Sequence, residues 1–339
     1  MNGADTAFAP GRVNLIGDHV DYVGGRALPM AIQLGTTVTL AGRGGTRIRL
    51  SSDAVPGALD VAIDADPATV DPPWGRHVVA VLRELAISAG GTGTVTTSLP
   101  VGAGLSSSAA LEVAVALAFG TDLTGLDLAL ACHRAEAAAT GVPTGILDQL
   151  TITSACDGAA LLVDCRDLST RAVRLPDGLA IHAVHCGESR SLTGSAYASR
   201  RTACEDIERE IGPLRDATMD DIASLADRGR RRRARHVVSE IARVGDFTDA
   251  MDAGDLDAMG HLADESHRSL RDDYEVSSVA LDAAVERARR VPGVIGARLT
   301  GAGFGGCIVV FAHRDVDPAE IGGWRLDASG PARRIPPAR

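Results

Sequence analysis

The pattern of hydrophobic and polar positions divides the chain into strand-like and helix-like segments. Alternating and β-branched runs predict strands, whereas hydrophobic positions spaced three and four residues apart predict helices. Strands are predicted over residues 7–14, 27–40, 90–98, 159–164, 179–184, 294–300 and 307–312, with more between 38 and 61. Helices are predicted over residues 74–89, 109–119 and 126–139, and over most of 195–290. The two kinds of segment do not alternate as β-α-β units, so the pattern predicts the α+β class.

The length of the chain and its composition predict two domains. The chain has 339 residues, of which 45% are hydrophobic and only 3% are aromatic, so the core is expected to be aliphatic. We place the boundary at residue 170, which gives domains over 1–170 and 171–339. The tail after Arg314 is rich in proline and glycine and is expected to be irregular.

Charge limits the classes of partner. The net charge is −10, which argues against a nucleic acid or an anionic membrane as the main partner, because both bind basic surfaces. The basic run from Arg230 to Arg233 has acidic residues on both sides, and we interpret it as a solvated helix face. All 34 basic residues are arginine, so a Walker-type lysine is excluded.

Other sequence signals are those of a cytoplasmic protein. The six cysteines form no CxxC pair, which indicates reduced thiols rather than a disulfide framework or a metal site. The first ten residues lack the basic start and apolar stretch of a signal peptide, and no apolar run reaches membrane length. We expect a monomer that does not bind membranes.

A glycine- and serine-rich segment, Gly102 to Ser108, precedes the apolar helix predicted at 109–119. Glycines allow backbone N–H groups to point at an anion, and a helix N-terminus adds free N–H groups and a positive dipole. The serines add hydroxyl groups that can donate to phosphate or bind Mg²⁺. The segment therefore predicts a phosphate site, although a serine-capped buried helix would have the same pattern.

Three further segments are candidates for chemistry. The segment from Gly11 to Gly25 places an arginine, two carboxylates and an imidazole between two strands, which suits recognition of sugar hydroxyls or is simply a polar hairpin. Asp148 follows a glycine turn, and is either a helix cap or a buried base. The glycine-rich turn at 300–307 is either a loose hairpin or a close contact with a nucleotide or with the phosphate loop.

Together these segments resemble the GHMP kinase superfamily, and within it the galactokinase family. The matching stretches are, in chain order, GRVNLIGDHVDYVGG, PVGAGLSSSAALE, GVPTGILDQL and ARLTGAGFGGC, with RSLTGSAYASRRTACE and SLRDDYEVSS also similar. The resemblance spans residues 8–312. It implies an N-terminal half similar to the second domain of ribosomal protein S5, a ferredoxin-like C-terminal half, and an active site in the cleft between them.

The resemblance also implies roles for individual residues. Asp148 matches the catalytic aspartate, and Arg12 matches the arginine beside it. The positions that match sugar contacts are Asp18, His19, Asp21, Gly145 and Tyr197. The ATP phosphate loop matches Gly102, Ala103, Gly104, Leu105, Ser106, Ser107 and Ser108, and the Mg²⁺ ligands match Ser108 and Glu136. The implied reaction is phosphorylation of the C1 hydroxyl of galactose by ATP and Mg²⁺, giving galactose 1-phosphate and ADP.

Two departures from the family leave alternatives open. Asp18 stands where the family usually has glutamate, and the chain is shorter and diverges after Ala312. The alternatives are a kinase for N-acetylgalactosamine, arabinose or a uronic acid, or a sugar sensor without turnover. The serine loop, Asp148 and Arg12 are all present, which favours an enzyme over a sensor. Asp148 acts either as a base or through its charge alone.

Overall fold

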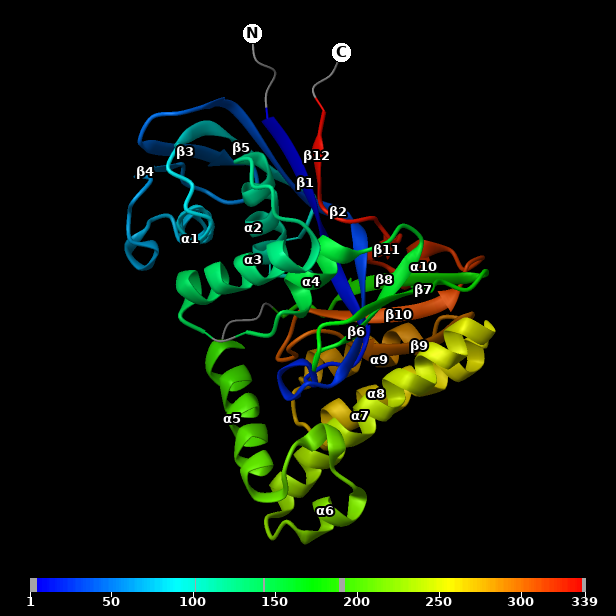
Figure 1. Cartoon of the computed structure of the whole chain (residues 1–339). Coiled ribbons are helices and arrows are strands. Elements are labelled where there is room, and N and C mark those ends of the chain that lie inside the picture. The colour runs from blue at the N-terminus through cyan, green and yellow to red at the C-terminus, as the bar shows by residue number, and fades with distance from the viewer. Residues whose placement is uncertain (1–4, 101, 143, 189–192, 337–339) are drawn as a thin grey trace.

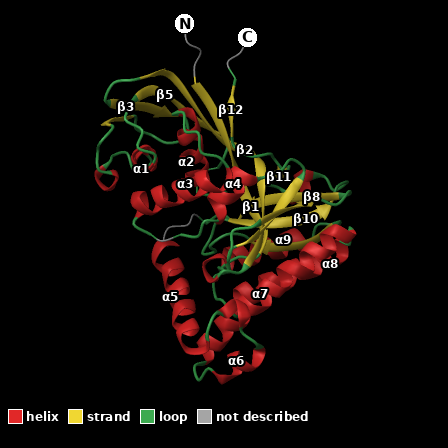
Figure 2. Cartoon of the chain, in the orientation of Figure 1, coloured by secondary structure: helices red, strands yellow, loops and turns green. Residues whose placement is uncertain are grey.

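The computed structural model of the chain describes residues 5–100, 102–142, 144–188 and 193–336 (Figure 1), with the backbone alone at 193–195. Val101, Pro143 and residues 190–192, which belong to the matching stretches, lie outside the described residues. Strands form two separate sheets with helices packed around each (Figure 2). This mixture of helices and mainly antiparallel sheet confirms the predicted α+β class.

The larger sheet has eight strands. Its main path runs β12-β1-β2-β5-β3-β4, while β6 pairs with β2 and β7 pairs with β6. Pairing is antiparallel except between β3 and β5. The strands are β1 (Asp5–Ile16), β2 (Arg26–Arg43), β3 (Arg47–Ser52), β4 (Leu59–Ala62), β5 (Gly91–Thr97), β6 (Ala159–Asp164), β7 (Thr170–Arg174) and β12 (Arg333–Ile335).

Four helices pack on one another, and α2 and α4 among them pack against β1 and β2 of this sheet. They are α1 (Gly75–Glu84), α2 (Ser107–Ala118), α3 (Gly125–Thr140) and α4 (Leu147–Ser154). The predicted helices at 74–89, 109–119 and 126–139 correspond to the first three. Short 3-10 helices, η1 (Asp21–Val23) and η2 (Pro67–Thr69), lie in the connections.

The second sheet has four antiparallel strands in the order β11-β8-β10-β9. These are β8 (Leu179–His185), β9 (Val294–Leu299), β10 (Cys307–His313) and β11 (Trp324–Leu326). The helices of this half are α5 (Thr193–Ile211), α6 (Met219–Ser224), α7 (Arg228–Ala253), α8 (Leu256–Asp272), α9 (Val279–Arg289) and α10 (Pro318–Ile321), with the 3-10 helix η3 (Leu214–Asp216). The two late strands joined by a glycine-rich turn are present as predicted.

The expectation of an irregular tail after Arg314 is wrong. This segment forms α10 and two short strands, of which β11 pairs with β8 and β12 pairs with β1. Each strand has only three residues, so the local composition carries little signal and pairing with an existing strand decides the conformation. The division at residue 170 stays a prediction: β7 spans that position, and β12 returns to the first sheet.

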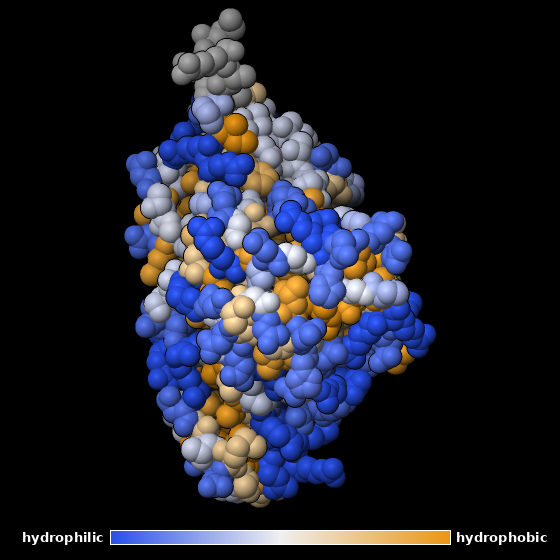
Figure 3. Space-filling model, turned by 90° about the vertical axis from the view of Figure 1, so that its right-hand side faces the viewer, coloured by the Kyte–Doolittle hydropathy of each residue, from blue (hydrophilic) through white to orange (hydrophobic). Residues whose placement is uncertain are grey.

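Hydrophilic residues cover most of the face drawn in Figure 3, and hydrophobic residues form groups among them. The basic run lies at the start of α7 and its guanidinium groups meet acidic partners. Arg230 pairs with Glu210 at 2.5 Å, and Arg232 pairs with Glu275 at 2.6 Å. The interpretation of this run as a solvated helix face holds only in part, because Arg230 to Arg233 are half-buried rather than fully solvated.

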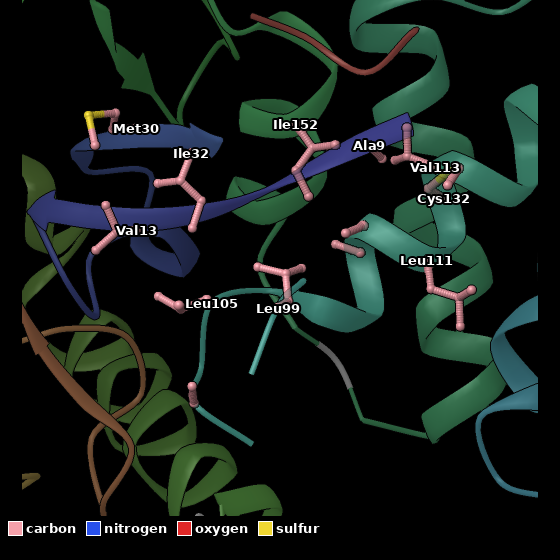
Figure 4. Close-up of a cluster of buried hydrophobic side chains, with 14 of the residues drawn as sticks. Ala9, Val13, Met30, Ile32, Leu99, Leu105, Leu111, Val113, Cys132 and Ile152 are labelled. Carbon is pink, nitrogen blue, oxygen red and sulfur yellow. The ribbon is translucent and has the colours of Figure 1, made fainter. Parts of the chain in front are cut away.

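The hydrophobic core holds the predicted phosphate loop, Gly102 to Ser108, in place (Figure 4). Leu99 and Leu105, on either side of the loop's turn, are buried beside β1 and β2. Burying a leucine side chain contributes roughly 1.5–3 kcal/mol, so two of them anchor the loop firmly. The strand also comes close to the loop: a Cβ on Gly11 would lie 2.6 Å from the carbonyl oxygen of Leu105, so only glycine fits there.

Candidate functional site

A cavity of about 320 Å³ opens where the two halves meet. It collects residues from β1 and the hairpin after it, from α3 and the start of α4, from α5, and from the turn between β9 and β10. The residues predicted from the sequence that line this cavity are Arg12, Asp18, His19, Asp21, Glu136, Gly145, Asp148 and Tyr197. The fold thus brings together segments that lie nearly 290 positions apart in the chain.

Asp148 accepts hydrogen bonds from two residues, Arg12 and Ser106. It is the second residue of α4, and Ile146 occupies the cap position, so the helix-cap interpretation is wrong. Its Oδ1 accepts from Arg12 through Nε at 2.7 Å and Nη2 at 2.5 Å. Its Oδ2 accepts from the Ser106 hydroxyl. Such bonds fix the direction of the carboxylate and place a permanent positive charge beside it.

Arg12 also joins this carboxylate to the phosphate loop. Its Nη1 donates to the carbonyl oxygen of Gly104 at 2.8 Å, and its backbone N–H donates to that of Leu105 at 3.2 Å. The arginine is 8% exposed, so these bonds form away from bulk water. The loop and Asp148 therefore occupy fixed positions relative to each other.

The side chains of the predicted phosphate loop point in different directions. Those of Ala103 and Leu105 are buried in the core, so these two residues can offer only backbone groups to a ligand. Ser106 has a φ of +61°, an uncommon conformation for a residue with a side chain, and its hydroxyl goes to Asp148 rather than capping α2. Ser107 and Ser108 face a second cavity. The serine-cap interpretation therefore fails at Ser106.

Glu136, on α3, is 8% exposed and both its oxygens are occupied. Oε1 accepts from Ser108 Oγ at 3.1 Å, while Oε2 accepts from Thr144 Oγ1 at 2.7 Å and from Gln149 Nε2 at 3.1 Å. A carboxylate and a hydroxyl are donors that suit Mg²⁺. No cluster of three or more His, Cys, Asp or Glu side chains that could hold a metal occurs among the described residues. A cation here would therefore take further ligands from phosphate and water.

Asp18 has protein donors on both oxygens. Oδ2 accepts from Arg298 Nη2 at 2.5 Å, and Oδ1 accepts from the backbone N–H of Gly301 at 2.9 Å. Arg298 is completely buried and also lies 3.6 Å from the buried carboxylate of Glu240. Asp18 still lines the cavity, and an ionised carboxylate has further lone pairs for a ligand hydroxyl.

Both ring nitrogens of His19 contact protein groups. Nε2 lies 3.1 Å from the carbonyl oxygen of Ala302, and Nδ1 lies 3.1 Å from the Tyr22 hydroxyl. A carbonyl oxygen only accepts, so Nε2 carries a proton. His19 thus ties the hairpin after β1 to the glycine turn of the second sheet.

Asp21 and Tyr197 are the groups whose pKa the site changes most. Burial, with the nearby charge of Asp148, raises the pKa of Asp21 to about 6. Burial, with the charges of Asp21 and Asp148, raises the pKa of Tyr197 well above its usual value, so the phenol stays a donor. A Cβ on Gly145 would lie 1.6 Å from Asp21 Oδ2, so the carboxylate depends on glycine at that position.

The sequence did not reveal a second cavity, of about 300 Å³, beside the phosphate loop. Its wall includes Trp74, immediately before α1, and His77 of α1, together with Ser107, Ser108 and Leu111. Behind the wall, buried Glu112 accepts from Gln149 Nε2 at 3.1 Å and lies 2.8 Å from His77 Nδ1. One signal was available: Glu112 is the only charged residue in the apolar run 109–119.

Comparison with known proteins gives consistent matches. Family models match the galactokinase galactose-binding signature at residues 2–41, the N-terminal domain of GHMP kinases at 76–156 and their C-terminal domain at 247–322. The chain is 40% identical to galactokinase of Homo sapiens and 41% identical to that of Bos taurus, each over 330 residues. Both alignments cover 91% of this chain and 84% of the relative.

Solved structures agree with these matches. Lactococcus lactis galactokinase complexed with galactose superposes with a TM-score of 0.91 at 29% identity, covering 98% of this chain and 96% of that one. Mevalonate kinase of Methanococcus jannaschii has the same fold, with a TM-score of 0.73 at 18% identity and coverage of 96% and 98%. In the part of the chain that the structure describes, no helix is both long and apolar enough to cross a membrane.

Proposed function

Because this chain belongs to the galactokinase family of the GHMP kinases, we propose that it transfers a phosphoryl group from ATP to the C1 hydroxyl of galactose. The products are galactose 1-phosphate and ADP. The observation that supports this most directly is the Asp148 carboxylate, which Arg12 and Ser106 orient at the junction of the cavity and the phosphate loop.

Asp148 is proposed as the group that takes the proton of the C1 hydroxyl. The sugar oxygen then attacks the γ-phosphorus, the bond to the β-phosphate oxygen breaks, and ADP leaves. A positioned carboxylate contributes about 10²–10⁴-fold to such a proton transfer. The guanidinium of Arg12 remains charged throughout and offsets the negative charge that develops between the sugar and the phosphates.

The other end of the first cavity is proposed to recognise the sugar. Asp18 and Asp21 offer carboxylate oxygens to the sugar hydroxyls, and Tyr197 offers a phenol O–H. His19 and Gly145 support this set, the first by fixing the hairpin and the second by leaving room for Asp21. Carboxylate acceptors among apolar lining residues such as Val142 and Leu147 suit a ligand that carries several hydroxyl groups on an apolar ring.

We assign the second cavity to the nucleoside part of ATP. Trp74 provides a flat aromatic surface in this cavity. Ser107 and Ser108, the first two residues of α2, also line it, so the cavity adjoins the end of the phosphate loop. The residues proposed to hold Mg²⁺ are Ser108 and Glu136, because they place a hydroxyl and a carboxylate together between the two cavities. Mg²⁺ bound there would neutralise charge on the phosphate chain.

The test is an assay of ADP release with ATP and a panel of sugars: galactose, N-acetylgalactosamine, arabinose and galacturonate. We expect turnover with galactose and identification of the product as the 1-phosphate by ³¹P NMR. Faster turnover of another sugar would show that this sugar, and not galactose, is the substrate. Sugar binding without any turnover would indicate a sensor.

A monomeric state and a cytoplasmic location remain predictions. Light scattering tests the first, and cell fractionation tests the second.

A further inference from the structure

Helix α1 places two ring side chains in the second cavity. Trp74, immediately before the helix, and His77 are three positions apart and both line the wall. Ser108 and Leu111 of α2 line the same space. His77 therefore shares this cavity with the start of α2, which is where the phosphate loop ends.

Glu112 holds the imidazole of His77 in one orientation. Ser108 and Glu112 are four positions apart and so share one face of α2. Glu112 is completely buried, with His77 Nδ1 at 2.8 Å from Oε1 and Gln149 Nε2 at 3.1 Å from Oε2. The carboxylate accepts from both neighbours, so Nδ1 carries the proton and Nε2 lies on the opposite edge of the ring.

The Nε2 atom of His77 is available for a ligand. None of the described residues forms a hydrogen bond with it, and the side chain is 18% exposed. The described wall of this cavity contains no arginine and the chain has no lysine, so His77 is the one side chain of the wall that can carry positive charge. Burial lowers the pKa of His77, but the hydrogen bond and the charge of Glu112 outweigh it and raise the pKa overall. Burial also raises the pKa of Glu112, to about 7, although its hydrogen bond with His77 lowers it.

We propose that His77 binds the phosphate chain of the nucleotide through Nε2, with Glu112 as the residue that positions it. This inference rests on the assignment of the second cavity to ATP. A polyphosphate needs cationic or N–H donors around it, and Arg12 is already bound to Asp148 and to the loop carbonyl of Gly104. His77 would thus supply, from α1, the charge that a lysine supplies in other kinases.

The experiment compares binding of adenosine, ADP and ATP by isothermal titration calorimetry, with EDTA present so that no Mg²⁺ contributes. His77→Gln can still donate to Glu112 but carries no charge, and His77→Leu removes both functions. We expect both variants to bind ADP and ATP about tenfold more weakly, with adenosine affinity unchanged. The matched control is His261→Leu, which removes a histidine that is 70% exposed on α8 and should change none of the three affinities.

Glu112→Gln tests the positioning role, and should weaken ADP and ATP binding while leaving adenosine binding intact. Equal losses for all three ligands in the His77 variants would overturn the proposal, because they would show that His77 packs against the nucleoside. Unchanged affinities for ADP and ATP in both His77→Gln and His77→Leu would overturn the proposal as well. If the wild-type protein bound none of the three ligands, the assignment of this cavity to ATP would itself fail. If instead the wild-type protein bound them normally and the His77 variants did so equally well, only the role of His77 would fail.

Discussion

The guanidinium group of Arg298 donates to the carboxylate of Asp18 at 2.5 Å, across 280 positions of sequence. Arg298 is completely buried, and its Nη1 also donates to the carbonyl oxygen of Leu15 at 3.0 Å. The pair joins the hairpin after β1 to β9 of the second sheet. A residue matched to sugar recognition is therefore also part of the contact between the two halves.

We predict that Arg298→Met lowers the free energy of unfolding by about 3–5 kcal/mol, because it leaves the buried carboxylates of Asp18 and Glu240 without their shared cation. Urea denaturation measures this. Arg209→Met is the control: its ion pair with Asp206 is exposed and should contribute less than about 1 kcal/mol. Equal free energies of unfolding for the two variants would show that the buried ion pairs of Arg298 with Asp18 and Glu240 do not stabilise the fold.

Asp148→Asn should reduce turnover on the order of 10²–10⁴-fold, because the amide cannot take the proton of the sugar hydroxyl. ATP affinity should stay unchanged, since Asp148 lines the first cavity and not the second, which is assigned to ATP. Stopped assays of sugar phosphate and calorimetry with ATP measure the two quantities. Asp127→Asn, an exposed aspartate on α3, is the matched control. Turnover at the wild-type rate would remove Asp148 from the mechanism.

Sugar affinity should depend on pH through Asp21. The pKa of Asp21 is raised to about 6, so the carboxylate is ionised above that pH and protonated below it. Sugar hydroxyls donate to the ionised form, so affinity is full above pH 6 and is lost as the pH falls through 6. If only the ionised form binds, affinity at pH 5 should be about tenfold lower than at pH 7.5. Calorimetry at both pH values gives the ratio, and Asp21→Asn should abolish this dependence.

Gly145→Ala should weaken sugar binding while leaving nucleotide binding intact. The added Cβ would lie 1.6 Å from Asp21 Oδ2, so the carboxylate must move away from its position in the cavity. The control is Gly245→Ala in α7, where a Cβ meets no atom within 4 Å and the helix should gain roughly 0.5–1 kcal/mol. An unaltered sugar affinity in Gly145→Ala would show that the position of Asp21 does not determine sugar binding.

Ser108→Ala and Glu136→Ala should each raise the Mg²⁺ concentration needed for half-maximal activity. Each removes one oxygen from the proposed cation site, which has few other protein ligands. Titration of activity with Mg²⁺ at fixed ATP measures this. Thr144→Val removes a donor to Glu136 without removing an oxygen that faces Ser108, and should have a smaller effect. Identical titration curves for all variants would place the metal elsewhere.

Local patterns predicted the elements whose signals lie within one segment. The apolar run at 109–119 corresponds to the buried helix α2, and the alternating Thr94 to Thr97 lies in β5. Composition also marked the segment from Gly11 to Gly25 and Asp148 as candidates, whereas the cleft and the roles of Glu136, Gly145 and Tyr197 came only from the family resemblance. The helix, the strand and the polar segments depend on neighbours within a few positions, which the sequence displays directly.

Long-range relationships were not predictable in the same way. Nothing near Arg298 in the sequence indicates that Asp18 is its partner, or that β12 returns to pair with β1. The second cavity was missed because Trp74 and His77 precede the phosphate loop by some thirty positions and lie beside it only in the folded protein. Glu112 could have been noticed, since a single carboxylate in an apolar helix needs a buried partner.

The pairing of β12 with β1 brings the two ends of the described chain together. Thr6 and Ile335 are opposite each other in the ladder, so their Cα atoms are about 5 Å apart. A short glycine-rich peptide would be enough to join the first and last strands covalently. New termini could then be opened at the exposed turn 44–46 between β2 and β3, which lines neither cavity. The fold thus permits circular permutation, in which the chain order changes and the sheet keeps its strand order.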